Sequence, residues 1–117
     1  MNGEEQRGLR ESLTEEELAI FDILTRPEPE LSDKEKGDVK KVAKELLAKL
    51  KAEKLVLDWR EKMQARAGVQ QTIRVAFRTL PPPYSAELKR VKTNLTYAHV
   101  YDSYSGSGKS VYESALN

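Results

Sequence analysis

The chain has 117 residues, of which 38% are hydrophobic and 33% charged, and its formal net charge at pH 7 is +1. That length allows one domain with a modest core, and so many charged residues favour a small helical domain. The absence of cysteine excludes disulfides and cysteine-ligated zinc, and a single histidine excludes a histidine metal cluster. No apolar run is long enough to span a membrane, and the charged N-terminus does not resemble a signal peptide, so we expect a cytoplasmic protein.

The charges are unevenly distributed along the chain. Residues 1–33 carry ten acidic side chains and three arginines, whereas residues 34–117 carry seventeen lysines or arginines and nine acids. This division favours pairing between an acidic first helix and a basic body. The alternative is a basic face that is left free to bind phosphate.

Residues 1–12 are polar, and we expect them to be flexible. The first helix is predicted for residues 14–25, because Thr14 and Glu17 form a capping box ahead of apolar residues at helical spacing. Two prolines end this helix, since each lacks a backbone N–H. A second capping box predicts a helix for residues 33–53, with its start marked by Ser32 and Glu35.

The second helix carries a regular apolar stripe with lysines on the opposite face. The stripe consists of Val39, Val42, Ala43, Leu46, Leu47 and Leu50. We interpret the lysine face as solvated, and the alternative is contact with phosphate or an acidic partner.

A third helix is predicted for residues 58–80, with Asp58 as its N-cap. At about 100° per residue, one face gathers the apolar residues that we expect to anchor the core. These structural anchors are Trp59, Met63, Ile73 and Phe77.

Arg66 falls in the middle of that face. An unpaired charge among apolar side chains is costly, so its guanidinium must reach solvent or find a carboxylate or carbonyl partner. One interpretation is an internal salt bridge, for example to an acid of the first helix. The other is that this face is only half covered and docks a partner. Candidate contacts to a protein partner or to phosphate are therefore Arg66 and Gln70 on the face, and Arg60, Arg74 and Arg78 near its edge.

Three prolines at 81–83 break the chain, and Ser85 then caps a fourth helix predicted for residues 85–104. Its core face is expected to consist of Leu88, Val91, Leu95 and Ala98, beside tyrosines that cover the core edge or an interface. Residues 105–117 are expected to form a flexible or docked tail. The prediction is thus one all-α domain, residues 13–104, in which three long helices and a short first helix form a small bundle.

Two motifs invite a catalytic interpretation and do not support it. Residues 106–110 resemble the end of a phosphate-binding loop, but Ser103 stands where the first glycine is required, and no strand is expected before it. His99 has only Asp102 nearby in sequence, so a structural role is favoured. We therefore predict no catalytic, cofactor-binding or metal-binding residue.

Four segments carry a resemblance to a known family. They are Leu13–Asp22, Val42–Leu47, Lys54–Arg60 with Gln64–Ala67, and His99–Tyr104, in order and within residues 13–112. Together they resemble the C-terminal helical region of the restriction (R) subunit of type I restriction–modification enzymes.

The resemblance implies a much longer parent chain. In that family an N-terminal nuclease domain cuts DNA, and two helicase-like motor domains use ATP and Mg²⁺ to translocate duplex DNA. The C-terminal region is thought to attach the subunit to the core of methylation and specificity subunits. The expected partners are those subunits and the rest of the R subunit, with DNA as a secondary partner and no membrane. The alternatives are a helical domain that contacts DNA phosphates or the motor, and a free-standing helical adaptor.

Overall fold

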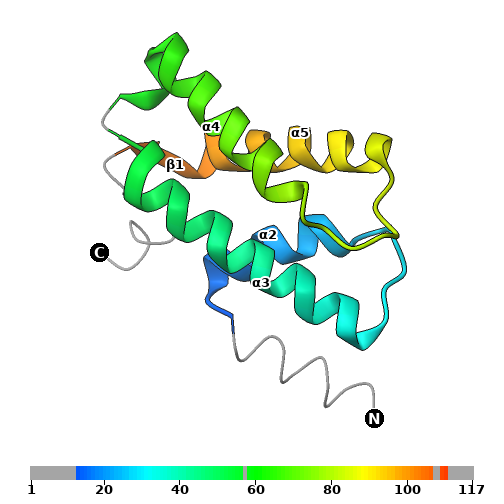
Figure 1. Cartoon of the computed structure of the whole chain (residues 1–117). Helices are drawn as coiled ribbons and strands as arrows, with labels where there is room; N and C mark the ends of the chain where they lie inside the picture. The colour runs from blue at the N-terminus through cyan, green and yellow to red at the C-terminus, as the bar shows by residue number, and fades with distance from the viewer. Residues whose placement is uncertain (1–12, 57, 107–108, 111–117) are drawn as a thin grey trace.

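Figure 1 shows the computed structural model of the chain, which describes residues 13–56, 58–106 and 109–110. In these ranges the main elements are helices α2 (Glu15–Thr25), α3 (Asp33–Lys49), α4 (Met63–Phe77) and α5 (Ala86–Ser103). The prediction of a small all-α bundle is confirmed. The flexible segment predicted for residues 1–12 and most of the predicted tail lie outside the described residues.

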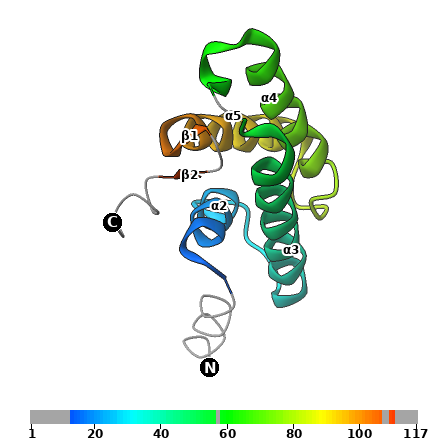
Figure 2. The same cartoon turned by 90° about the vertical axis from the view of Figure 1, so that its left-hand side faces the viewer.

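The helices pack as two pairs. Helix α2 lies against α3 and α4 lies against α5, while α2 also touches α5 and α3 touches α4 (Figures 1 and 2). One continuous core fills the space between the pairs. Its largest fully buried apolar side chains include Trp59, Phe77 and Tyr104. Each helix therefore has one outer surface available to solvent or to a partner.

The predicted caps of three helices are confirmed. The backbone N–H of Glu17 donates to the Thr14 hydroxyl at 3.1 Å, and the Glu17 carboxylate accepts from the Thr14 N–H at 3.0 Å. Ser32 and Glu35 repeat this arrangement at the start of α3. Ser85 accepts from the backbone of α5 in the same way. Each of these helix starts depends on two residues three positions apart, so a short sequence pattern is enough to predict it.

The predicted helix start at Asp58 is wrong. Asp58 has a φ of 59° in the left-handed region, and its side chain caps no backbone N–H. It is followed by a short 3-10 turn, η2 (Trp59–Glu61), and by the extended Lys62, so α4 begins only at Met63. The α-helix ends at Phe77, and bonds between residues three apart continue as turns to Leu80. Because the start is displaced, the face inferred for this helix is displaced with it.

The second helix also departs from its predicted end. It is α-helical to Lys49 and continues as one π-helical turn, η1 (Leu50–Lys54), in which the N–H of Leu55 donates to the carbonyl of Leu50 at 2.8 Å. The wider turn accommodates one extra residue. Leu50 and Leu55 are consequently both buried, at 0% and 2% exposure.

Two short strands follow α5, where we predicted no strand. Strand β1 (Tyr104–Gly106) pairs antiparallel with β2 (Lys109–Ser110), with Tyr104 opposite Ser110. The segment that resembles a phosphate-binding loop thus begins in one strand of this ribbon and ends in the other.

The core face predicted for α5 is mostly wrong, because Leu88 alone of its four residues packs against the core, and it is partly buried. Its buried residues are mostly polar, namely Lys92, Thr93, Thr96, Val100 and Ser103. The expected core residues Val91 and Leu95 are 41% and 49% exposed, and Ala98 is exposed as well. The reason lies in α2, whose end presents carbonyl groups that need donors.

Lys92 of α5 and Tyr84, which precedes α5, supply those donors. Pro27 has no N–H, so the Ile23 carbonyl cannot be satisfied within α2. The Lys92 ammonium donates to the carbonyls of Ile23 at 2.7 Å and Arg26 at 2.9 Å, and the hydroxyl of Tyr84 donates to Leu24 at 2.7 Å. Burial lowers the pKa of Lys92, and the Glu28 carboxylate opposes that shift. Lys92 is therefore a structural residue that holds α2 against α5.

The acidic first helix pairs with basic residues of the rest of the chain, as we expected from the uneven distribution of charge along the sequence. Glu16 and Glu17 of α2 form ion pairs with Lys51 at 3.1 Å and with Lys44 at 3.4 Å. The lysines are about a third or more exposed, so each pair contributes at most about 1 kcal/mol. The pairs orient α2 on α3 more than they stabilise the fold.

Candidate interaction surfaces

The face predicted around Arg66 does not assemble as expected. Met63 is 75% exposed and Gln70 is exposed, so neither is part of the core. The buried side of α4 consists of Val69, Thr72, Ile73 and Phe77. Ile73 and Phe77 are core residues as predicted, and Trp59 is fully buried in η2 instead of in the helix.

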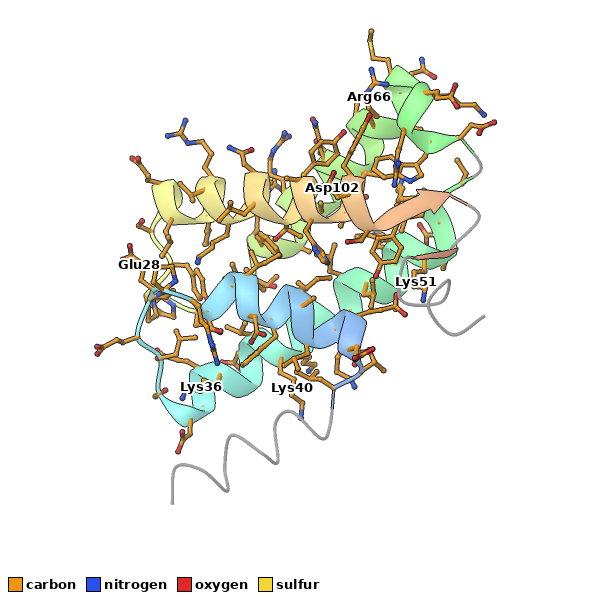
Figure 3. All side chains as sticks on the ribbon, turned by 180° about the vertical axis from the view of Figure 1, so that it is seen from behind. Glu28, Lys36, Lys40, Lys51, Arg66 and Asp102 are labelled. Atoms are coloured by element: carbon orange, nitrogen blue, oxygen red, sulfur yellow. The ribbon has the colours of Figure 1, made fainter. Side chains whose placement is uncertain are left out.

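Arg66 has an internal partner. Its guanidinium donates to the backbone carbonyl of Arg60, and the side chain is half-buried. Figure 3 places Arg66 on α4 at the end of the molecule that also holds the last turn of α5, where Asp102 is labelled. A backbone carbonyl is therefore the partner of the Arg66 guanidinium, which is one of the partners that we expected. A salt bridge from Arg66 to an acid of the first helix, which we gave as an example, is not present among the described residues.

Arg60 is also held inside the fold. Its Nε donates to the carbonyl of Tyr104 at 3.0 Å, and its guanidinium lies 5.2 Å from the ring centre of Tyr101. The indole N–H of Trp59 donates to the same carbonyl at 3.2 Å. Arg60 thus joins η2 to the end of α5, and it is not among the residues that line a groove with Arg74 and Arg78.

Three aromatic rings cover this end of the core. Trp59 makes edge-on contacts with Tyr97 and Tyr101 at centroid distances of 6.3 and 5.8 Å. The hydroxyl of Tyr104 donates to Glu16 at 2.7 Å, and Glu16 in turn pairs with Lys51. Such edge-on pairs stabilise by about 1 kcal/mol beyond the area they bury. These tyrosines cover the edge of the core, which is one of the two roles that we predicted for them.

The outer surface of α5 carries an exposed apolar row, which we call the α5 stripe. It consists of Val91, Leu95 and Ala98, which recur at helical spacing. A helix that buries lysine and threonine while it exposes valine and leucine has the reverse of the usual pattern. The α5 stripe is therefore a candidate contact surface.

A groove between α4 and α5, which we call the basic groove, has a volume of about 510 Å³. Its lining residues are Arg74, Arg78, Ala86, Lys89, Arg90, Thr93 and Asn94. Four of them are cationic, and among the described residues none with a carboxylate lines it. The structure thus brings the predicted Arg74 and Arg78 together with Lys89 and Arg90, which the sequence interpretation missed. The sequence does indicate this cluster, because a short connection at residues 81–83 must place the end of one helix, with Arg74 and Arg78, beside the start of the next.

A second groove of about 470 Å³ lies between α3 and α4. Its floor contains Val42, Leu46 and Val75, and Glu45, Lys49, Glu53 and Lys54 are among its charged lining residues. The charges are balanced, so this groove shows no preference for a partner of one sign.

His99 has no catalytic arrangement around it. Its Nδ1 lies 3.4 Å from the Ser103 hydroxyl, and its Nε2 is buried without a hydrogen-bond partner in the part of the chain that the structure describes. Burial lowers the pKa of His99, and Asp102 opposes the shift. In the same part of the chain, no group of three or more Asp, Glu or His side chains could hold a metal ion, and no helix is long and apolar enough to cross a membrane.

Acidification is expected to destabilise the fold through His99. The unfolded-state pKa is about 6.5 and the folded-state pKa is lower, so as the pH falls the unfolded chain binds the proton first. The free energy of unfolding should therefore decrease below about pH 6.5. Urea midpoints measured at pH 7.5 and 5.5 test this, with His99→Gln as the comparison. An equal pH dependence in wild type and variant would contradict the assignment to His99.

A family comparison identifies the chain. The model described as "Type I restriction enzyme HindI endonuclease subunit-like, C-terminal" matches residues 1–103. The chain belongs to this family. It is therefore a C-terminal domain of a type I restriction enzyme subunit, in agreement with the resemblance seen in the sequence. No curated protein and no solved structure is significantly similar to the chain.

The matched range includes the helices α2 to α5 that the described part of this restriction-subunit domain forms, so it also includes the α5 stripe and the basic groove. The β1–β2 ribbon lies beyond it, since β1 begins at Tyr104. The two candidate surfaces thus belong to the part of the chain that defines the family.

Proposed function

We propose that this restriction-subunit domain docks its subunit onto the methylation and specificity subunits, with the α5 stripe as the apolar centre of the contact. The observation that carries the proposal is the reversed pattern of α5. Lys92 and Thr96 occupy the core side, while Val91 and Leu95 stay about half exposed on the outside. Covering two such side chains completely would contribute roughly 1–3 kcal/mol.

On this proposal the domain has no catalytic residue and binds no cofactor. Cleavage of DNA and ATP-driven translocation, with their ATP and Mg²⁺, take place in other domains of the cytoplasmic subunit. The contribution of this domain is positional, because it holds motor and nuclease on the complex that recognises the DNA sequence.

Direct contact with DNA phosphates is the second candidate function. Its support is the basic groove, with Arg74 and Arg78 on its rim. Several cations that could contact phosphate have partners inside the fold, because Lys44 and Lys51 pair with glutamates and Arg60 donates to the Tyr104 carbonyl. These internal partners favour the docking function over the DNA function.

Leu95→Asp is expected to weaken binding of the chain to the purified methylation–specificity complex by at least tenfold, which is about 1.4 kcal/mol. The reason is that the variant places a charge in the apolar centre of the contact. Titration by calorimetry in the absence of DNA provides the measurement.

Val75→Asp is the matched control, since Val75 is 41% exposed and lies on the α3–α4 groove. Its affinity should stay within about twofold of wild type. If Val75→Asp weakens binding and Leu95→Asp does not, the contact surface is the α3–α4 groove and not the α5 stripe.

A further inference from the structure

The cations that line the basic groove have no carboxylate among the other lining residues. By comparison, Lys44 of α3 and Lys51 of η1 are each paired with a glutamate of α2. Among the described residues, the ion pair recorded for a groove cation is the exposed contact of Arg90 with Glu87 at 3.7 Å, and Glu87 does not line the groove. Arg74 donates to the neutral amide of Gln71. The groove therefore concentrates positive charge that the fold itself does not neutralise, and such a potential attracts a group of opposite sign.

The start of α5 adds to this potential. Ala86 is the first residue of the helix, and it lines the groove together with Lys89 and Arg90 of the first turns. The N-terminal end of a helix carries a partial positive charge that favours anions. Lys89 donates to the Arg78 carbonyl at 3.5 Å and Arg90 pairs with Glu87 at 3.7 Å, and both contacts are exposed, so the two cations stay accessible to a partner.

The groove is not purely polar. Between its cationic side chains lie the methyl group of Ala86 and the nearly buried Thr93. A volume of about 510 Å³ accommodates several side chains. A polypeptide offers apolar side chains and carboxylates together, which matches this combination of cationic and apolar lining residues.

The basic groove and the α5 stripe lie on adjoining faces of α5. Asn94 of the groove is three residues from Val91 and four from Ala98 of the stripe, and residues three or four apart are neighbours on a helix surface. A single partner lying along α5 would therefore contact both. It would need an apolar row for the stripe and acidic residues for the groove.

We propose that this surface receives an acidic amphipathic helix of the methylation or specificity subunit. Its apolar side chains cover Val91 and Leu95, and its glutamates or aspartates enter the basic groove and contact Arg74, Arg78 and Arg90. Helices of this kind are commonly bound in grooves through residues spaced three or four apart. The proposal rests on the docking function proposed above and adds the chemical character of the partner.

The test is the affinity of the chain for the purified methylation–specificity complex, without DNA, at several salt concentrations. Arg78→Glu/Arg90→Glu is expected to raise Kd at least tenfold at low salt. The dependence of log Kd on log salt should also become flatter than in wild type, because fewer charge pairs form. Lys34→Glu/Lys41→Glu reverses two exposed lysines of α3 and is expected to leave both Kd and salt dependence unchanged. If the doubly reversed groove variant does not fold by circular dichroism, Arg78→Gln/Arg90→Gln replaces it, with a smaller expected change.

Three other results would each contradict the proposal, and each has a different meaning. Wild-type binding that the arginine variants leave unchanged refutes the acidic helix, although docking through the α5 stripe stands. Binding of a duplex DNA fragment at physiological salt that is lost in the arginine variants identifies phosphate as the occupant of the groove. No binding of the wild-type chain to the complex removes the docking function and this proposal together.

Discussion

Replacing Lys92 with methionine is expected to lower the free energy of unfolding by about 3 kcal/mol. Methionine fills a similar space but cannot donate, so the carbonyls of Ile23 and Arg26 lose their partner at the end of α2. Two unsatisfied carbonyls cost about 1–3 kcal/mol each, and the desolvation cost that the ammonium no longer incurs offsets part of this loss. Urea unfolding followed by tryptophan fluorescence provides the measurement.

Lys89→Met is the control for this prediction, because Lys89 lies one turn earlier on α5 and is not buried. Its effect should stay within about 0.5 kcal/mol. If both lysine variants are as stable as wild type, the contact between Lys92 and α2 does not hold the helices together.

Replacing Trp59 with alanine is expected to cost about 4 kcal/mol of stability. The indole is fully buried, packs edge-on against Tyr97 and Tyr101, and donates to the Tyr104 carbonyl. Its loss leaves a cavity where η2, α4 and α5 meet. Total stabilities of small domains are about 5–15 kcal/mol, so this one change removes a large fraction.

Trp59→Phe separates packing from hydrogen bonding. The phenyl ring retains most of the apolar contact, and Arg60 still donates to the Tyr104 carbonyl. The expected cost is therefore only about 1–2 kcal/mol. Circular dichroism follows unfolding of both variants, since the chain has no second tryptophan. A cost below about 1 kcal/mol for Trp59→Ala would show that this end of the core does not depend on the indole.

The features that the sequence predicted correctly depend on neighbouring residues. The caps at Thr14, Ser32 and Ser85 each use a group three positions along the chain, so a short pattern contains the whole interaction. Asp58 has the same pattern with Glu61, yet its backbone is left-handed and it caps nothing. That difference arises from the turn that carries the chain from η1 to α4, which the local pattern does not contain.

The errors in α5 have a long-range origin. Apolar periodicity assigned Val91 and Leu95 to the core, but the position of α5 is determined by the carbonyls of α2, about 66 to 69 residues earlier. Lys92 satisfies them only from the core side, and the apolar residues are then directed outward. The basic groove is a different case, since the short connection at residues 81–83 places Lys89 and Arg90 beside Arg74 and Arg78, and the sequence interpretation missed this. A mismatch between pattern and burial identified the α5 stripe, and the charges of the lining residues identified the basic groove.

Binding of the unmodified 117-residue chain to the purified methylation–specificity complex, without DNA, tests the docking function most directly. Docking predicts a saturable complex that survives physiological salt, because its centre is the apolar α5 stripe. A chain that does not bind this complex at any salt concentration, and that binds duplex DNA under the same conditions, would contradict it.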